Sequence, residues 1–374
     1  MEAALSPGGS PAIPAVICYE DIFFRDHWGD LTPCPWWYQH APDIERQMEW
    51  RRDAIAHTGQ DWFCLPLCAP REEREAISIE VRPDGVFRRN RRTGATEPLE
   101  PPRVGGWTAP GRLHSVRPER LMDSVAQIDD AVPLPTPADL DVALSAGVGD
   151  LAAAMLSEFG RDLCPICHVA GPLWLCYYLW GFEGMMETVA LRPDLVEHAC
   201  ERLLAQSIHS ARLAAAIGAR GIWIEDCMTD AVSPDTFARL NVPALGRLVA
   251  GIRALGMRSI YYYCGDPADR WEQLFAVGAD ALSLEESKKG FRIEIEDVVE
   301  RAAGRCAVLG NLDAMGLLEK GADAELRDEI ARQLQAGRRS GGRFIMSLGS
   351  PVTPGTSVER VRLYCSLVRG LSRG

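Results

Sequence analysis

The stretch GIWIEDCMTDAVSPDTFARL (221–240) passes from a β-strand pattern directly to a helix start. GIWIED (221–226) is a short apolar run that ends on two carboxylates. Ser233 and Pro234 then open a helix, with Ser233 as the N-cap and Pro234 in the first turn. The stretch therefore predicts one strand followed by one helix.

The same order recurs along the rest of the C-terminal half. Short apolar runs lie at SIYYYC (259–264), DALSLE (280–285), CAVLGN (306–311) and RFIMSL (343–348). Helical patterns follow them at 267–277, 292–303, 323–338 and 357–369. Strands that are apolar on both faces are typical of a parallel sheet covered by helices.

The N-terminal half shows the same alternation at a slower rhythm. Strand candidates are PAVICY (14–19), DWFCLPL (61–67) and LCPICHVAG (163–171), and a helical region covers 182–217. Residues 76–98 predict a hairpin that turns at Pro83-Asp84-Gly85.

Together the two halves give eight strands, each followed by helical or inserted material. We expect an α/β fold, a single (β/α)8 barrel over 14–374 with an inserted β-hairpin, preceded by a flexible N-terminal extension at 1–13. A G-x-G-x-x-G motif does not follow an early strand, which disfavours a dinucleotide-binding fold.

The amino-acid composition of the chain argues against some classes of binding partner. The chain has 374 residues, with 40 Lys and Arg against 52 Asp and Glu and a net charge of −12, which argues against nucleic-acid binding. We find no apolar run long enough to cross a membrane and no signal-peptide pattern. The 12 cysteines lack the spacing of a small disulfide scaffold, so we expect reduced thiols and a cytoplasmic location.

The barrel prediction also locates a site, because active sites of this fold lie at the C-terminal ends of the strands. Polar and thiol side chains gather at these predicted ends, whereas the strand bodies are apolar. The residues are Tyr19, Glu20, Asp21, Cys64 to Cys68, His168, Glu225, Asp226, Tyr262, Tyr263, Cys264, Glu285, Glu286, Asn311, Asp313, Ser347 and Ser350. An enzyme with a small-molecule substrate is the natural expectation.

At these strand ends the sequence resembles the uroporphyrinogen decarboxylase superfamily. The superfamily also contains methylcobamide:coenzyme M methyltransferases and the catalytic domain of cobalamin-independent methionine synthase. The segments that carry the resemblance are PDGVFRRNRRTG (83–94), GPLWLCYYLWGFEGMM (171–186), WIEDCMTDAVSPDTF (223–237), YYYCGDPADRW (261–271), GADALSLEES (278–287), VLGNLDA (308–314) and SPVTPGTSVERV (350–361). Their common order over about residues 60–374 is specific for the superfamily but not for one activity.

The resemblance implies a zinc site in the methyltransferase branch, where zinc holds a substrate thiol as the nucleophilic thiolate. Two of the four ligand positions match here, namely Cys264 and Glu285. Tyr262 stands where the family has a histidine, and Ser350 where it has a late cysteine. Zinc held by Cys264 and Glu285 is one expectation. The alternative is a buried thiol and a hydrogen-bonded carboxylate that line the pocket.

Strand alternation selects further pocket residues. Adjacent residues of a strand face opposite sides, so we expect Glu225 in the pocket and Asp226 either at its rim or capping a neighbour. Glu225 would act as a general base or orient a cationic substrate. His168 is either a pocket acid, base or ligand, or a hydrogen-bonded packing residue.

The remaining candidates are assigned to substrate binding. Asn311 and Asp313 follow the seventh strand and either bind substrate or stabilise their turn. Trp36 and Trp37 form either an aromatic lid over the mouth or a packing or dimer contact. We expect Glu225, Tyr262, Cys264 and Glu285 to be catalytic, and His168, Asn311, Asp313, Ser350, Trp36 and Trp37 to bind substrate.

The decarboxylase branch binds its polycarboxylate tetrapyrrole through an Arg-rich motif after the first strand. Here that segment, CYEDIFFRDHWGD (18–30), offers only Arg25, beside Glu20, Asp21 and Asp26, which disfavours uroporphyrinogen as the substrate. The first hypothesis is therefore one-carbon (methyl) transfer from a methylated corrinoid or a small methylated donor. The second is decarboxylation of a small aromatic or pyrrole acid, and the third is a non-catalytic partner of a corrinoid protein. A second copy of the chain is a further candidate partner.

Overall fold

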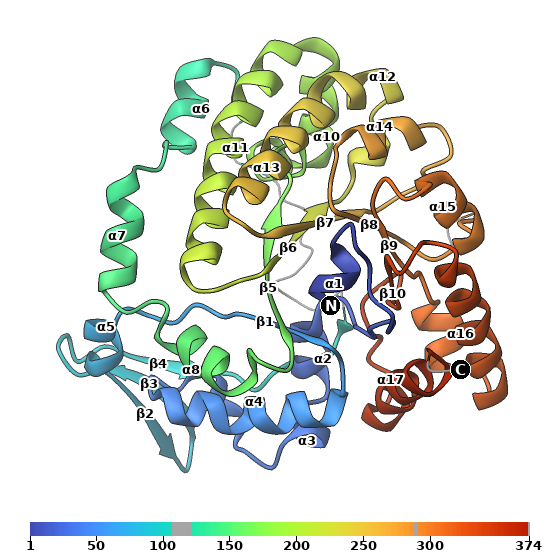
Figure 1. Ribbon diagram of the computed structural model, residues 1–374. Helices are drawn as coiled ribbons and strands as arrows, with labels where there is room; N and C mark the ends of the chain where they lie inside the picture. The colour runs from blue at the N-terminus through green and yellow to red at the C-terminus, as the bar shows by residue number, and fades with distance from the viewer. Residues whose placement is uncertain (107–117, 119–120, 288–289, 373–374) are drawn as a thin grey trace.

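Seven short parallel strands form one sheet in the computed structural model, which describes residues 1–106, 118, 121–287 and 290–372. Across the sheet they are β1 (Trp62–Cys64), β5 (Cys164–Ala170), β6 (Gly221–Asp226), β7 (Arg258–Tyr263), β8 (Ala281–Leu284), β9 (Ala307–Leu309) and β10 (Phe344–Ile345). Neighbours in the sheet follow chain order, and helices lie outside the strands (Figure 1). The predicted α/β class is confirmed.

The segment predicted as the first strand closes the ring between β10 and β1. Ala15 pairs in parallel with Met346, and the Val16 amide donates to the Met346 carbonyl at 2.9 Å. On the other side the Asp61 amide donates to the Ala15 carbonyl at 2.9 Å. The ladder then stops because the Gln60 side chain accepts from the Ile17 amide at 3.1 Å. This segment takes the eighth position, so the fold is the predicted (β/α)8 barrel.

Helices connect the strands of the C-terminal half, as the pattern predicts. They are α9 (Pro172–Leu175), α10 (Tyr177–Leu191), α11 (Pro193–Ala216), η3 (Thr229–Ala231), α12 (Pro234–Thr236), η4 (Phe237–Asn241), α13 (Val242–Ala254), α14 (Trp271–Ala276), α15 (Ile295–Ala302), η5 (Ala314–Glu319), α16 (Asp323–Arg338) and α17 (Val358–Ser372). Ser233 caps α12, since its side chain accepts from the Thr236 amide. The region predicted as one helix over 182–217 divides at Arg192, because a residue that precedes proline avoids the helical conformation.

The N-terminal half carries the insertions. Before β1 lie α2 (Glu20–Asp26), α3 (Trp28–Leu31), η1 (Trp36–His40) and α4 (Ile44–Thr58). Between β1 and β5 lie α5 (Arg71–Ala76), β2 (Ile77–Arg82), β3 (Gly85–Asn90), β4 (Thr96–Leu99), α6 (Val125–Ala131), α7 (Pro137–Ser145) and α8 (Asp150–Phe159). Arg82 pairs with Gly85, so the hairpin turns at Pro83 and Asp84 as predicted, and β4 adds a third antiparallel strand.

Residues 1–13, for which we expected a flexible end, contain α1 (Glu2–Leu5) and pack under the barrel. In Figure 1 α1 lies in the middle of the ring of strands. Ala4 and Leu5 are fully buried, and the Ser10 amide donates to the Gly342 carbonyl at 2.8 Å. The segment differs from the expectation because its apolar side chains cover the end of the barrel opposite the mouth.

The described helices were also compared with the requirements of a membrane span. Within those residues no single helix is both long and apolar enough to cross a bilayer, and only the bent pair α7 and α8 meets the length and composition limits together.

Candidate active site

Along β6, side chains alternate between the barrel interior and the helix layer. Asp226 faces outward, where it accepts hydrogen bonds from Tyr261 Oη at 2.6 Å and from Asn241 Nδ2 at 2.7 Å. Burial raises the pKa of Asp226 to about 6, and these hydrogen bonds oppose the shift. Glu225 faces the opposite way, into the mouth, as the alternation predicts.

Glu225 meets His168, which lies in the last part of the neighbouring strand β5, two residues before its end at Ala170. The His168 Nδ1 and a Glu225 carboxylate oxygen are 3.1 Å apart, and both side chains are about one quarter exposed, at 26% and 25%. On the other side of the ring, His168 Nε2 lies 3.5 Å from the sulfur of Cys64. The carboxylate orients the imidazole by accepting from Nδ1–H, which leaves Nε2 to exchange a proton in the mouth.

Behind Cys64 lies the buried carboxyl of Glu20, which is 3% exposed. It accepts from the Cys64 amide at 2.8 Å and from the Gln60 side chain. Burial raises the pKa of Glu20 to about 7, although both hydrogen bonds and the charge of His168 act in the opposite direction. A carboxyl group that titrates near neutral pH beside an imidazole is typical of an acid–base site. Burial, together with Glu20, also raises the pKa of the Cys64 thiol.

The raised pKa of Glu20 predicts a pH dependence of stability. The protonated carboxyl is favoured in the folded state, so its contribution is complete below the unfolded pKa of 4.5 and is lost as the pH rises through about 7. A shift of this size corresponds to about 3 kcal/mol. In urea titrations at pH 5 and pH 8, Glu20→Gln should remove this decrease, and the exposed control Glu45→Gln should keep it. Parallel pH profiles for the wild type and Glu20→Gln would contradict the prediction.

Aromatic rings form the floor below His168 and Glu225. Trp223 stacks on Tyr262 with ring centroids 5.0 Å apart and lies 6.1 Å from the His168 ring. Tyr19 meets the edges of His168, Trp223 and Tyr262 at 5.4, 5.8 and 5.9 Å. Tyr19 has a φ of 54°, a left-handed conformation that is uncommon for residues other than glycine and that concentrates at functional sites. The floor is therefore apolar and aromatic.

Two thiols lie close together next to Glu225. The half-buried Cys264 follows β7, and Cys227 follows β6. A hydrogen bond between the two side chains, together with burial, raises the pKa of Cys227 well above the usual value for a thiol. The Cys227 thiol therefore stays protonated at neutral pH and is a weak nucleophile.

The zinc ligands implied by the resemblance are not assembled around these thiols. The Tyr262 hydroxyl donates to the Gly349 carbonyl at 3.1 Å, and the Ser350 hydroxyl donates to Glu286 at 2.8 Å. Across the ranges that the structure describes, no three His, Cys, Asp or Glu side chains are grouped so that they could hold a metal ion. The donors found here therefore do not fit a zinc thiolate centre.

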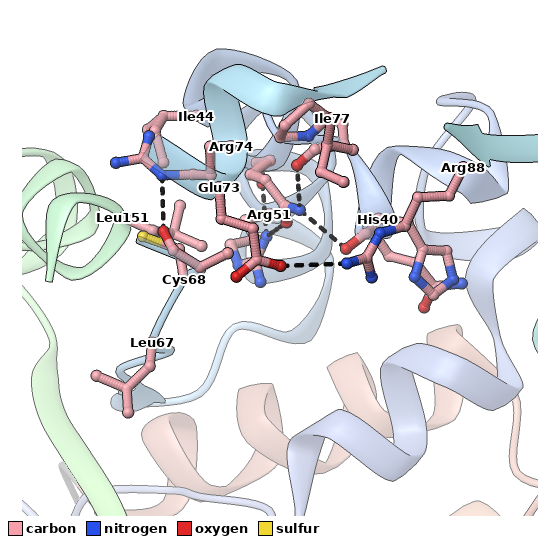
Figure 2. A pocket seen from close by; sticks show the side chains of 15 residues that line it. His40, Ile44, Arg51, Leu67, Cys68, Glu73, Arg74, Ile77, Arg88 and Leu151 are labelled. Carbon is pink, nitrogen blue, oxygen red and sulfur yellow. Dashed lines mark hydrogen bonds and ion pairs between the residues drawn. The ribbon is translucent and has the colours of Figure 1, made fainter. Parts of the chain in front are cut away.

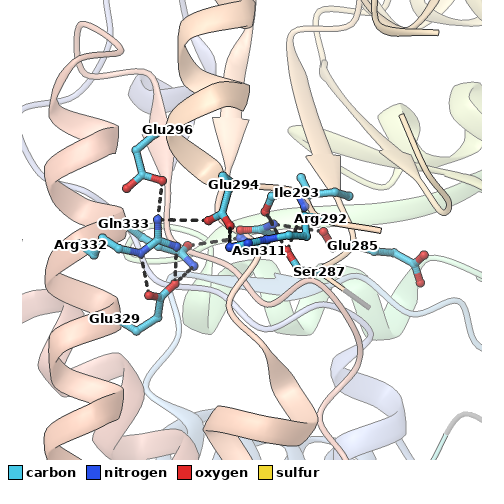
Figure 3. A network of polar contacts seen from close by, with 10 residues as sticks. All are labelled: Glu285, Ser287, Arg292, Ile293, Glu294, Glu296, Asn311, Glu329, Arg332 and Gln333. Carbon is cyan, nitrogen blue, oxygen red and sulfur yellow. Dashed lines mark hydrogen bonds and ion pairs between the residues drawn. The ribbon is translucent and has the colours of Figure 1, made fainter. Parts of the chain in front are cut away.

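The Asn311 side chain contacts the backbone carbonyl of Glu285. Glu285 is buried, and Asn311 Nδ2 donates to its carbonyl at 3.2 Å and to the Ile293 carbonyl at 2.9 Å. Figure 3 shows the Glu285 carboxylate pointing away from the network around Arg332. Asp313 caps η5 by accepting from the Met315 and Gly316 amides. These contacts of Asn311 and Asp313 are those of the turn-stabilising alternative, and substrate binding by either residue stays a prediction.

Trp36 and Trp37 lie in η1 beside α4. Both are half-buried, and the Arg46 guanidinium lies 5.4 Å from the Trp37 ring. Within the described ranges, neither indole forms a hydrogen bond or ring contact with His168 or Glu225. The lid over the mouth stays a prediction.

Sequence reasoning did not select Cys227, Trp223 or the buried role of Glu20 for the site. Glu20 and Cys227 each follow a predicted strand directly, so their position was a usable signal. Trp223 lies two residues before Glu225, and alternation would have placed it on the same inward face.

The fold and these contacts define a class: a (β/α)8 barrel with a histidine–carboxylate pair and a buried carboxyl near the C-terminal ends of its strands. Residues 117–371 match the family model described as Uroporphyrinogen decarboxylase (URO-D). The chain belongs to the URO-D family, which confirms the resemblance seen in the sequence.

Known proteins of the family are distant in sequence. Uroporphyrinogen decarboxylase from Solibacter usitatus is 31% identical over 155 residues, which are 41% of this chain and 42% of that protein. The Ralstonia pickettii enzyme of that name is 26% identical over 238 residues, 60% of this chain and 63% of that protein. The chain thus spans less than two thirds of either relative. A solved methyltransferase from Methanosarcina mazei has the same fold, with a TM-score of 0.68, 17% identity and coverage of 98% and 96% of the two chains.

Proposed function

We propose that this chain is a URO-D family enzyme that decarboxylates a small aromatic or pyrrole carboxylic acid. The observation that carries the proposal is the His168–Glu225 pair, 3.1 Å apart at the barrel mouth above an aromatic floor. Decarboxylation without a cofactor requires one group that delivers a proton to the carbon left behind, and a carboxylate-oriented histidine is suited to that step. The curated relatives named uroporphyrinogen decarboxylase support the reaction class.

In the reaction the carbon–carboxylate bond and the Nε2–H bond of His168 break, and one carbon–hydrogen bond forms. The bond between the ring or side-chain carbon and the carboxylate breaks, and its electron pair stays on that carbon. The carboxylate leaves as CO2. Protonated His168 donates from Nε2 to the carbon, and Glu225 stabilises the imidazolium through Nδ1. His168 is 26% exposed and recovers its proton from solvent.

The aromatic floor also bears on the substrate class. The Trp223 and Tyr262 rings are buried directly below His168, so the histidine–carboxylate pair borders an apolar aromatic cluster, which suits an aromatic substrate. The apolar surroundings also weaken hydration of the carboxylate that is lost, which favours its conversion to neutral CO2.

Methyl transfer from a methylated corrinoid or small donor is the second candidate. The printed description of the Methanosarcina mazei neighbour as a methyltransferase favours it. It ranks second because Tyr262 and Ser350 donate hydrogen bonds elsewhere and the Cys227 thiol is held protonated. A non-catalytic partner of a corrinoid protein is the third reading. We further propose a cytoplasmic location, which is supported by the 12 cysteines, all thiols.

The test uses carboxyl-13C-labelled benzoic and pyrrole carboxylic acids in D2O, with the metal content of the same protein preparation measured in parallel. We expect labelled CO2 and a product that carries one deuterium at the former carboxyl carbon. Methylcobalamin and a thiol acceptor form the second arm. Methylated thiol with stoichiometric zinc would overturn the proposal in favour of methyl transfer. A stable complex with a corrinoid protein but no turnover in either arm would favour the partner role.

A further inference from the structure

A cavity of about 270 Å³ lies beside the barrel mouth, between α4, η1, the β1–α5 loop and the hairpin sheet. Arginines from three different elements line it, namely Arg51 of α4, Arg74 of α5 and Arg88 of β3 (Figure 2). The lining also holds the carboxylate of Glu73. The cavity is thus lined by an excess of positive charge.

Two of these arginines already have carboxylate partners. Arg74 binds Asp150 and also donates to the Ala69 carbonyl at 2.9 Å. Arg88 forms an ion pair with Glu73 at 3.2 Å. Their positive charges are therefore neutralised in part by the protein itself.

Arg51 differs from both. Its Nη1 donates to the Gln47 backbone carbonyl at 2.8 Å and to the Gln47 side chain at 2.5 Å, and its guanidinium lies 4.1 Å from the Trp50 ring. In the part of the chain that the structure describes, no carboxylate lies within ion-pair distance of Arg51, and its Nε and Nη2 form no hydrogen bond with the protein.

Burial lowers the pKa of Arg51 to about 9, which still leaves it charged at neutral pH. A half-buried guanidinium with no carboxylate at ion-pair distance favours an anionic ligand, because Arg binds carboxylates through two parallel hydrogen bonds.

The cavity adjoins the acid–base site. Leu67 and Cys68 line it and follow Cys64 in the same loop. The charge of Glu20 acts on Arg51, and Glu20 accepts from the amide of Cys64, whose thiol contacts His168. A ligand that reached both His168 and Arg51 would follow this loop from the mouth to the cavity.

We propose that Arg51 binds a second carboxylate of the substrate, one that is retained in the product. The substrate class is then a small planar dicarboxylic acid, with one carboxylate at His168 and the other in the Arg51 cavity. This inference rests on the proposed decarboxylation for the identity of the ligand. The Arg51 site itself is tested by binding alone.

Isothermal titration calorimetry with isophthalate and with inorganic phosphate tests the site. We expect isophthalate to bind the wild type, and Arg51→Gln to raise its Kd about 30-fold, as for the loss of charge-assisted hydrogen bonds. Arg52→Gln is the matched control, because Arg52 lies next in α4 but pairs with Glu45 and Glu158 on the exposed side. It should leave the Kd unchanged.

Glu73→Gln adds a test of opposite sign that leaves Arg51 in place. Loss of this carboxylate removes repulsion and one of the two carboxylate partners of Arg88, which also pairs with Glu97, so isophthalate should bind several-fold more tightly. Equal affinity in the wild type, Arg51→Gln and Glu73→Gln would overturn the proposal, as would phosphate binding more tightly than isophthalate. If Arg51→Gln fails to fold, the Kd of isophthalate for Glu73→Gln and Arg51→Lys tests the site instead. Isophthalate binding that depends on Arg51, without CO2 release from any acid, would support the anion site and reject the decarboxylase.

Discussion

Replacement of His168 by glutamine is expected to lower kcat/KM for decarboxylation about 1000-fold, within the range contributed by a general acid. Glutamine keeps a hydrogen bond to Glu225 but cannot release a proton from the position of Nε2. The measurement is steady-state CO2 release at pH 7, with folding checked by circular dichroism.

His198 supplies a matched control for this substitution. It also pairs with a carboxylate, with its Nε2 2.7 Å from Asp129, but lies on α11 outside the barrel mouth. His198→Gln should retain full activity. A His168→Gln variant with more than about one tenth of wild-type activity would exclude His168 as the proton donor.

Trp223→Ala should lower the free energy of unfolding by about 4 kcal/mol, the magnitude typical for removal of a large buried aromatic side chain. The Trp223 ring is fully buried, and its centroid lies 5.7 Å from that of Trp62 and 5.0 Å from that of Tyr262. The variant leaves a cavity in the centre of the barrel that the surrounding strands cannot fill.

Urea denaturation measures this loss, with Trp271→Ala as the comparison. Trp271 is also a tryptophan that stacks on an aromatic ring, Phe275, but it is only half-buried on α14. Its removal should cost about 1 kcal/mol. Similar losses in the two variants would show that the barrel interior tolerates a cavity at Trp223.

Local sequence patterns were sufficient for the strands. The runs at 221–226 and 280–285 are apolar on both faces because helices cover one side and the barrel core the other. The same patterns placed His168 and Glu225 at one edge, since the C-terminal ends of parallel strands meet there. That the two side chains lie 3.1 Å apart required the register of β5 and β6, which no local pattern contains.

The sequence patterns did not predict properties that depend on contacts between distant segments. Arg51 is one of several charged residues in the helical pattern of α4, and its lack of a carboxylate partner follows from how η1, α5 and the hairpin pack around it. Glu20 was recognised at a strand end, but its burial depends on Gln60 and Cys64 from the next strand. The packing of α1 under the barrel likewise required the complete ring.

The barrel closes where its first segment pairs with its last strand, β10. The first segment therefore has to wait for its partner during synthesis of the chain. Cys18 contacts the carbonyl of Leu348, 330 residues further along the chain. During translation the segment 14–18 therefore leaves the ribosome long before β10 exists to pair with it. The nascent chain must keep this apolar segment from wrong partners throughout elongation, a period of exposure in which chaperones protect such intermediates. Docking of the segment that is made first is expected to be among the last steps of folding, because contacts so distant in sequence form slowly.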